Sequence, residues 1–301
     1  MTKFFISFAL SMLALASMPA SAAVSVLTCE PEWAALATEL GGTKVKVSSA
    51  TTALQDPHRI EARPSLIART RNADLLVCTG LDLEAGWLPV LLEQAGNGKI
   101  MPGQPGHIEA GALVSRLEVP SRLDRSEGDV HAAGNPHVHL DPRNIARVAE
   151  VLAQRLSQID PANSAYYQSR HKGFDKRWNA ALQKWNQQAA PLKGVAVVEH
   201  HKNMAYLLNW LGMHSVGTLE AKPGVEPSAA HLTRLVGQLR SQPAKMILRG
   251  AYQDGRASKW LSERAHIPAV VLPFTVGGSE NAKDLFGLFD VTLERLLEAA
   301  R

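Results

Sequence analysis

Short apolar runs alternate with amphipathic helical patterns along this chain, and the whole alternation occurs twice. Runs of four to eight apolar residues, separated by patterns long enough for helices, are typical of parallel strands joined by helical crossovers. The apolar runs are "VSVLTC" (24–29), "DLLVCTG" (74–80), "GVAVVEH" (194–200), "AKMILRG" (244–250) and "PAVVLPF" (268–274), and "VKVSSATT" (45–52) is a further strand candidate. The pattern therefore predicts an α/β fold with two doubly wound lobes.

One long helical segment separates the two halves. It opens with Asp160 as an N-cap and Pro161 at the first helical position, and only Gly173 interrupts it before Pro191. A helix of about 30 residues is roughly 45 Å long, which is enough to cross a domain. We expect one rigid linking helix, with two helices broken at Gly173 as the alternative. The linking helix and the two lobes then comprise residues 160–190, 23–159 and 191–301.

The N-terminal 22 residues have the features of a secretory signal peptide. Lys3 precedes an apolar run over residues 4–16, and Ala-Ser-Ala at 20–22 forms a cleavage site near Ala22. The apolar run is too short to span a bilayer as a helix, and no later segment is long and apolar enough to do so. We expect a soluble protein that is exported to the periplasm.

The two cysteines, Cys29 and Cys78, each end a predicted strand. In an exported protein a cysteine pair favours a disulfide, and neighbouring strand ends would place the two side chains within bridging range. Lipidation of Cys29 is the alternative. It is disfavoured because Cys29 lies well past the apolar run of the signal and follows Thr28.

Composition and motifs exclude several functional classes. The net charge is +4, and the basic residues are scattered among acidic ones without a stripe, so nucleic-acid binding has no support. No HExxH, GxSxG or GxGxxG motif is present. The chain is therefore expected to be a binding protein rather than an enzyme. A zinc hydrolase with Glu199 or Glu61 as its general base is the alternative.

Three of the eleven histidines occupy comparable places, after a strand or loop and just before a helix. They are His58 in "DPHRIEARPS", His137 in "NPHVHLDP" and His201 in "VVEHHKNM". Ligands of doubly wound folds bind at the carboxyl ends of the strands. Three imidazoles that converge there would suit a divalent ion that prefers nitrogen ligands, such as zinc.

The order of these motifs resembles that of a known family. "DPH" followed by "PS", then "NPHVHLDP", then H-x-x-M-x-Y-L starting at His201 are similar to motifs of the periplasmic zinc- and manganese-binding (ZnuA/TroA-like) components of metal ABC transporters. The segment "NADLLVCTGLDLEAGWLP" (72–89) is similar to a further element of that family. The resemblance covers nearly all of the mature chain. It implies two α/β lobes joined by a rigid helix, with the metal held between them.

The resemblance also implies site residues and partners. The metal ligands would be His58 and His137 from the first lobe and His201 from the second. His201 is preferred to His200 because the family's ligand stands five residues before the tyrosine, here Tyr206. The cargo would be Zn(II), with Mn(II) or Fe(II) as alternatives. The partners would be an inner-membrane permease and its ATPase, with a periplasmic metallochaperone left open, and the receptor itself would be a monomer.

The sequence departs from the family pattern at two places. His139 stands where the family has a tryptophan, and Phe274 stands where many members have a carboxylate. The fourth ligand is therefore open among water, Glu280 and Glu61, and His139 and Glu280 are candidates for an additional metal contact. His131 and His139 are either a metal-capture antechamber or ordinary loop residues. A site without a carboxylate would suit zinc better than manganese.

Overall fold

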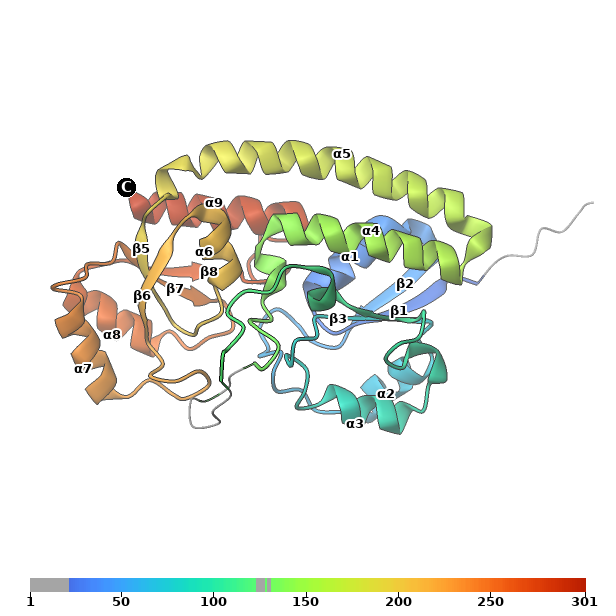
Figure 1. The fold of residues 1–301 in the computed structure, drawn as a ribbon, viewed down its shortest axis with the longest axis horizontal. Coiled ribbons are helices and arrows are strands. Elements are labelled where there is room, and N and C mark those ends of the chain that lie inside the picture. The colour runs from blue at the N-terminus through green and yellow to red at the C-terminus, as the bar shows by residue number, and fades with distance from the viewer. Residues whose placement is uncertain (1–21, 123–127, 129–130) are drawn as a thin grey trace, which may run out of the picture.

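The computed structural model describes residues 22–122, 128 and 131–301, so the predicted signal peptide lies outside the described residues apart from Ala22. The described residues form two four-stranded sheets in which every pairing is parallel. The strand orders are β2-β1-β3-β4 and β6-β5-β7-β8, so the two lobes repeat one topology (Figure 1). The predicted pair of α/β lobes is confirmed.

Six strands coincide with the predicted strand segments, and two edge strands, β4 and β6, were not predicted. β4 has three residues, and β6 ("HSVGT") is half polar with a glycine, so neither has the continuous apolar pattern of a buried parallel strand. The strands of the first sheet are β1 (Val24–Thr28), β2 (Val45–Ser49), β3 (Leu75–Cys78) and β4 (His107–Glu109). Those of the second are β5 (Ala196–Glu199), β6 (His214–Thr218), β7 (Met246–Gly250) and β8 (Ala269–Leu272).

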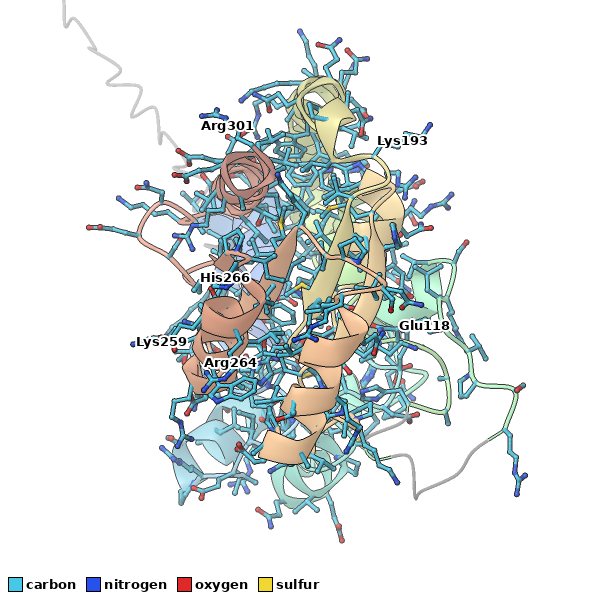
Figure 2. The ribbon with its side chains drawn as sticks, turned by 90° about the vertical axis from the view of Figure 1, so that its left-hand side faces the viewer. Glu118, Lys193, Lys259, Arg264, His266 and Arg301 are labelled. Atoms are coloured by element: carbon cyan, nitrogen blue, oxygen red, sulfur yellow. A yellow bond between two sulfur atoms is a disulfide. The ribbon has the colours of Figure 1, made fainter. Side chains whose placement is uncertain are left out.

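Helices cover both faces of each sheet. In the first lobe they are α1 (Pro31–Gly41), α2 (Pro64–Arg71), α3 (Leu88–Ala95) and α4 (Pro142–Ile159). In the second they are α6 (Ala205–Leu211), α7 (Ala229–Gln238), α8 (Arg256–Ala265) and α9 (Leu285–Ala300). The end-on view of Figure 2 shows α7 and α8 on the outer side of the second sheet, with Lys259 and Arg264 of α8 exposed.

The linking helix α5 (Ser164–Gln188) runs along both lobes, and Gly173 does not break it (Figure 1). The single linking helix is therefore confirmed, but it begins later than predicted. Pro161–Asn163 form a 3-10 turn, and the Asp160 carboxylate accepts hydrogen bonds from Asn163 and from the Tyr167 hydroxyl instead of capping the helix. The helix ends at Gln188, slightly before the predicted end at residue 190, because Ala190–Leu192 form a second 3-10 turn.

Two tryptophans fasten α5 to its neighbours. The Trp178 indole donates to the main-chain oxygen of Pro142 at the start of α4, at 2.8 Å. The Trp185 indole donates to the Asp290 carboxylate of α9, also at 2.8 Å. Because α4 belongs to the first lobe and α9 to the second, the linking helix is bonded to both, and this stiffens the connection.

Successive side chains of a strand point to opposite faces of the sheet, so neighbouring residues of β3 pack into different hydrophobic clusters. Leu75 and Val77 of β3 join a hydrophobic cluster that also contains residues of α1, α4, α5, α6 and α9. Leu76 and Cys78 point the other way, into a separate cluster beneath α2 and α3. The first cluster is continuous through both lobes, so the lobes share one core instead of meeting across a free hinge.

The predicted disulfide is present. β1 and β3 are adjacent, and the bridge joins Cys29 to Cys78 with their Cα atoms 4.8 Å apart. Both residues are buried in the outer core of the first lobe.

Among the helices of the described residues, none combines the length and the apolar character that crossing a membrane requires.

Candidate metal centre

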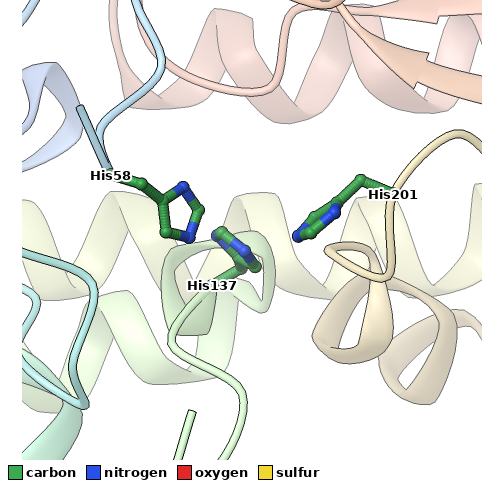
Figure 3. Close-up of side chains that lie close together, drawn as sticks. All are labelled: His58, His137 and His201. Carbon is green, nitrogen blue, oxygen red and sulfur yellow. The ribbon is translucent and has the colours of Figure 1, made fainter. Parts of the chain in front are cut away.

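The structure brings the three predicted histidine ligands together between the lobes (Figure 3). His58 lies in the loop from β2 to α2, His137 lies just before α4, and His201 follows β5. One ring nitrogen from each lies within 4.8 Å of the other two. The ring centroids are 5.7, 6.1 and 6.2 Å apart for the 58–137, 58–201 and 137–201 pairs. Loops that are far apart in sequence therefore present imidazoles to one point.

A carboxylate fixes the orientation of the His58 ring. Asp56 Oδ1 accepts hydrogen bonds from the His58 main-chain N–H at 3.1 Å and from its Nδ1 at 2.7 Å. Burial works to raise the pKa of Asp56, but the hydrogen bonds from His58 outweigh it, and the pKa is lowered. With the proton held on Nδ1, the Nε2 lone pair is directed into the cluster, as in carboxylate–histidine–metal arrangements.

Glu220 has the same role for His201. Its Oε2 accepts from His201 Nδ1 at 2.7 Å and from the Gly224 main-chain N–H at 2.8 Å. Glu220 has no signal in the sequence that links it to His201, because it lies 19 residues after its partner, just past β6. Only the pairing of β6 with β5 brings it to His201. Asp56, by contrast, could have been found from the sequence, because it stands two residues before His58 in the "DPH" motif.

His137 is the most deeply buried of the three. It is 1% exposed, and neither ring nitrogen has a hydrogen-bond partner among the residues that the structure describes. Burial, followed by repulsion from His58 and His201, holds the pKa of His137 well below 6.5, so the ring is neutral at neutral pH. An unpaired buried polar group costs about 1–3 kcal/mol. A bound cation would satisfy this nitrogen, so the residues fit a metal ion.

The other proposed contacts lie elsewhere. His139 is 2% exposed, but its Nδ1 lies 3.1 Å from Glu32 Oε1 and its Nε2 donates to the main-chain oxygen of Phe274 at 3.0 Å. Both nitrogens therefore face away from the three-histidine cluster. Glu61 pairs with Arg63 and is 80% exposed, and Glu280 is exposed as well. The structure does not bring these three residues into the cluster.

Phe274 packs against the cluster. Its ring is buried and lies edge-on to the His137 ring, with the centroids 5.5 Å apart. Its backbone has a φ of +69°, a left-handed conformation that is unfavourable for a bulky residue. The residue that stands where many family members have a carboxylate thus places an apolar ring beside His137.

A cavity of about 230 Å³ borders the cluster at His58 and His201. Four carboxylates line it, those of Asp56, Glu220, Glu226 and Asp254. The Arg59 guanidinium lines the cavity as well, so the carboxylates outnumber the guanidinium groups there, and the cavity favours cations although the chain carries a net charge of +4.

Glu199, proposed above as a general base for a hydrolase, has a structural role. It is 2% exposed, and its Oε2 accepts from the Met204 main-chain N–H at 3.0 Å. Burial raises its pKa. Its contact with Met204 closes the loop that carries His201, so the side chain shapes the site from behind.

Comparison with known proteins agrees with this architecture. Residues 26–299 match the family model described as "Zinc-uptake complex component A periplasmic" (ZnuA). The metal ABC transporter substrate-binding lipoprotein ScbA of Streptococcus cristatus is 25% identical over 86% of this chain and 83% of its own. The manganese ABC transporter substrate-binding lipoprotein PsaA of Streptococcus anginosus is 24% identical, with the same two coverages.

A solved structure of ZnuA covers 93% of this chain and 100% of its own, with a TM-score of 0.77 and 21% identity, and so has the same fold. The family consists of solute-binding proteins of metal transport, which confirms the expectation of a receptor and rules out the hydrolase alternative. Its members work with a membrane permease and an ATPase. The chain belongs to the ZnuA family, the substrate-binding components of metal ABC transporters.

Proposed function

We propose that this protein captures Zn(II) in the periplasm, through His58, His137 and His201, and delivers it to an inner-membrane ABC permease. The observation that carries the proposal is the convergence of three imidazole nitrogens within 4.8 Å of one another, drawn from both lobes. Asp56 and Glu220 hold two of the rings so that lone pairs face the common point. Zinc takes such nitrogen ligands at about 2.0–2.1 Å.

The donor set supports zinc over manganese. Manganese suits carboxylate and other oxygen ligands, whereas imidazole suits zinc. Among the described residues, no carboxylate oxygen joins the three-histidine group, and the place beside His137 is filled by the ring of Phe274. The family description names zinc, while several relatives are named for manganese, so the choice of metal is the point that needs measurement.

Metal titration of the mature protein tests the proposal. The protein is stripped with a chelator, reloaded with Zn(II), and compared with a His58/His137/His201 triple alanine variant. We expect one tight Zn(II) per chain, lost in the variant and not displaced by equimolar Mn(II). Equal zinc binding by the variant would refute the three-histidine site. Displacement of zinc by Mn(II) or Fe(II) would keep the receptor and change its cargo.

Export is tested separately. We expect the mature chain to begin near Ala23, after removal of the signal peptide, and to fractionate with the periplasm. Mass spectrometry of the intact protein identifies its N-terminus and any attached lipid. Recovery of a lipidated or uncleaved chain in the membrane fraction would contradict this expectation.

A further inference from the structure

We propose that His131 is the fourth metal ligand, which makes the site a set of four imidazoles. This inference rests on the proposed function, since it completes the same metal centre. His131 Nε2 lies 3.3 Å from His58 Nε2, and the two rings are stacked with their centroids 5.3 Å apart. Its ring also meets that of His137 almost at a right angle, with the centroids 6.4 Å apart.

The distance between the two Nε2 atoms fits a shared ion. In a tetrahedral site with zinc–nitrogen bonds of about 2.0–2.1 Å, neighbouring ligand nitrogens are about 3.3–3.4 Å apart. His58 carries its proton on Nδ1, where Asp56 accepts it, so its Nε2 presents a lone pair toward His131. Without the metal, His131 Nε2 can donate a hydrogen bond to that lone pair. When the ion binds, both nitrogens can turn their lone pairs to it.

The backbone holds His131 beside the cluster. Its main-chain oxygen accepts from Gly134 N–H at 3.2 Å, which closes a tight turn. The next residue, Ala132, donates its N–H to the Asp82 carboxylate at 3.0 Å, on the loop after β3. These two contacts hold the oxygen and the N–H of the peptide group that joins His131 to Ala132. Hydrogen bonds of the first lobe therefore fix the backbone that carries the ring.

The remaining candidates leave this position to His131. His139 is directed toward Glu32 and Phe274, and Glu61 pairs with exposed Arg63. Four neutral imidazoles would leave the full +2 charge on the bound ion. Such a set disfavours manganese, which suits oxygen donors, and favours zinc.

Two variants separate a ligand from a simple hydrogen-bond partner. His131→Ala removes the imidazole, whereas His131→Gln keeps a side-chain N–H that can still donate to His58 but is a poor zinc ligand. His214→Ala is the matched control, because His214 is exposed at the start of β6. Each full-length protein is measured by chelator competition for Zn(II). The number of imidazoles around bound zinc is counted by X-ray absorption at the zinc edge.

We expect four imidazoles in the wild type and the control, and three imidazoles with one oxygen in both His131 variants. Loss of even an outer-shell partner typically weakens metal binding 10–100-fold, so both variants should lose at least about tenfold in zinc affinity. Three imidazoles in the wild type, or a His131→Gln affinity equal to wild type, would overturn the proposal. In either case one zinc would still bind through the other three histidines, whereas failure of the proposed function would abolish tight zinc binding in the wild type.

Discussion

His139 of the first lobe donates a hydrogen bond from Nε2 to the main-chain oxygen of Phe274 in the second lobe, at 3.0 Å. Their rings also meet nearly perpendicularly, with centroids 5.2 Å apart. These are the two positions at which the sequence departs from the family pattern, and the fold places them in contact. The departures are therefore parts of one arrangement, in which His139 holds the turn that presents Phe274 to His137.

Replacing His139 by alanine should destabilise the protein markedly. His139 Nδ1 lies 3.1 Å from Glu32 Oε1, the two side chains are 2% and 1% exposed, and Glu32 also accepts from the Thr275 hydroxyl of the other lobe. Leaving a buried polar group without its partner typically costs about 1–3 kcal/mol, and here both the Glu32 carboxylate and the main-chain oxygen of Phe274 would lose theirs. We expect a loss of about 3 kcal/mol in urea unfolding of the metal-free protein. His214→Ala, at an exposed position, is the control and should cost less than about 1 kcal/mol. A loss that small for His139→Ala would contradict the structural role of His139.

Replacing Phe274 by aspartate should move the metal preference toward manganese. The ring of Phe274 lies beside His137, so a carboxylate at this position gives the site an oxygen donor, which manganese suits. The left-handed backbone at this residue also tolerates aspartate better than phenylalanine. We expect the ratio of Mn(II) to Zn(II) affinity to rise at least about tenfold in competition titrations, equivalent to about 1.4 kcal/mol. Phe274→Leu, the apolar control, should leave the ratio unchanged; an equal change there would show that packing, not charge, sets it.

Neutralising the carboxylates behind the ligands should weaken metal binding without unfolding the chain. Asp56→Asn and Glu220→Gln remove the charged acceptors that fix the Nδ1 protons of His58 and His201. Such outer-shell changes typically cost 10–100-fold in affinity. We expect that loss for each variant in zinc titrations, with one zinc still bound per chain. Unchanged affinity in both would show that the rings are held by packing alone.

A buried carboxyl pair should make stability depend on pH. Complete burial, reinforced by repulsion from Glu84 and Glu32, raises the pKa of Glu30 well above 4.5. Burial also raises the pKa of Glu84 to about 7, although its hydrogen bonds, including those from the main-chain N–H groups of Thr79 and Gly80, oppose the shift. Raised pKa values mean that the stabilisation is full below about pH 4.5 and is lost as pH rises through the folded-state values.

Glu30→Gln tests this dependence because the amide does not titrate. Its stability relative to wild type should increase from pH 5 to pH 8, by at least about 1.4 kcal/mol, the equivalent of one pKa unit. The measurement is thermal or urea unfolding of the metal-free protein at both pH values. A difference that is constant across this range would show that the Glu30 carboxyl does not titrate there.

Much of the fold could be predicted because its signals are local. The apolar runs at β1, β3, β5 and β7 belong to inner strands that are largely buried on both faces, so each is a nearly continuous apolar stretch. The linking helix was visible as a long segment without breakers, although its first turn was misplaced because Asp160 bonds to Tyr167. The disulfide followed from two cysteines at the ends of strands that prove to be neighbours.

The sequence by itself determined two doubly wound lobes, a linking helix and three histidines at the ends of loops. It could not identify Glu220 as the partner of His201, because 19 residues and a strand separate them and only the sheet pairing joins them. Nor could it show that His139 turns toward Phe274 while His131 approaches His58. Local patterns report which face of an element is buried. The direction of a loop side chain is decided by the groups that tertiary packing brings to it, because a buried polar atom must find a partner there.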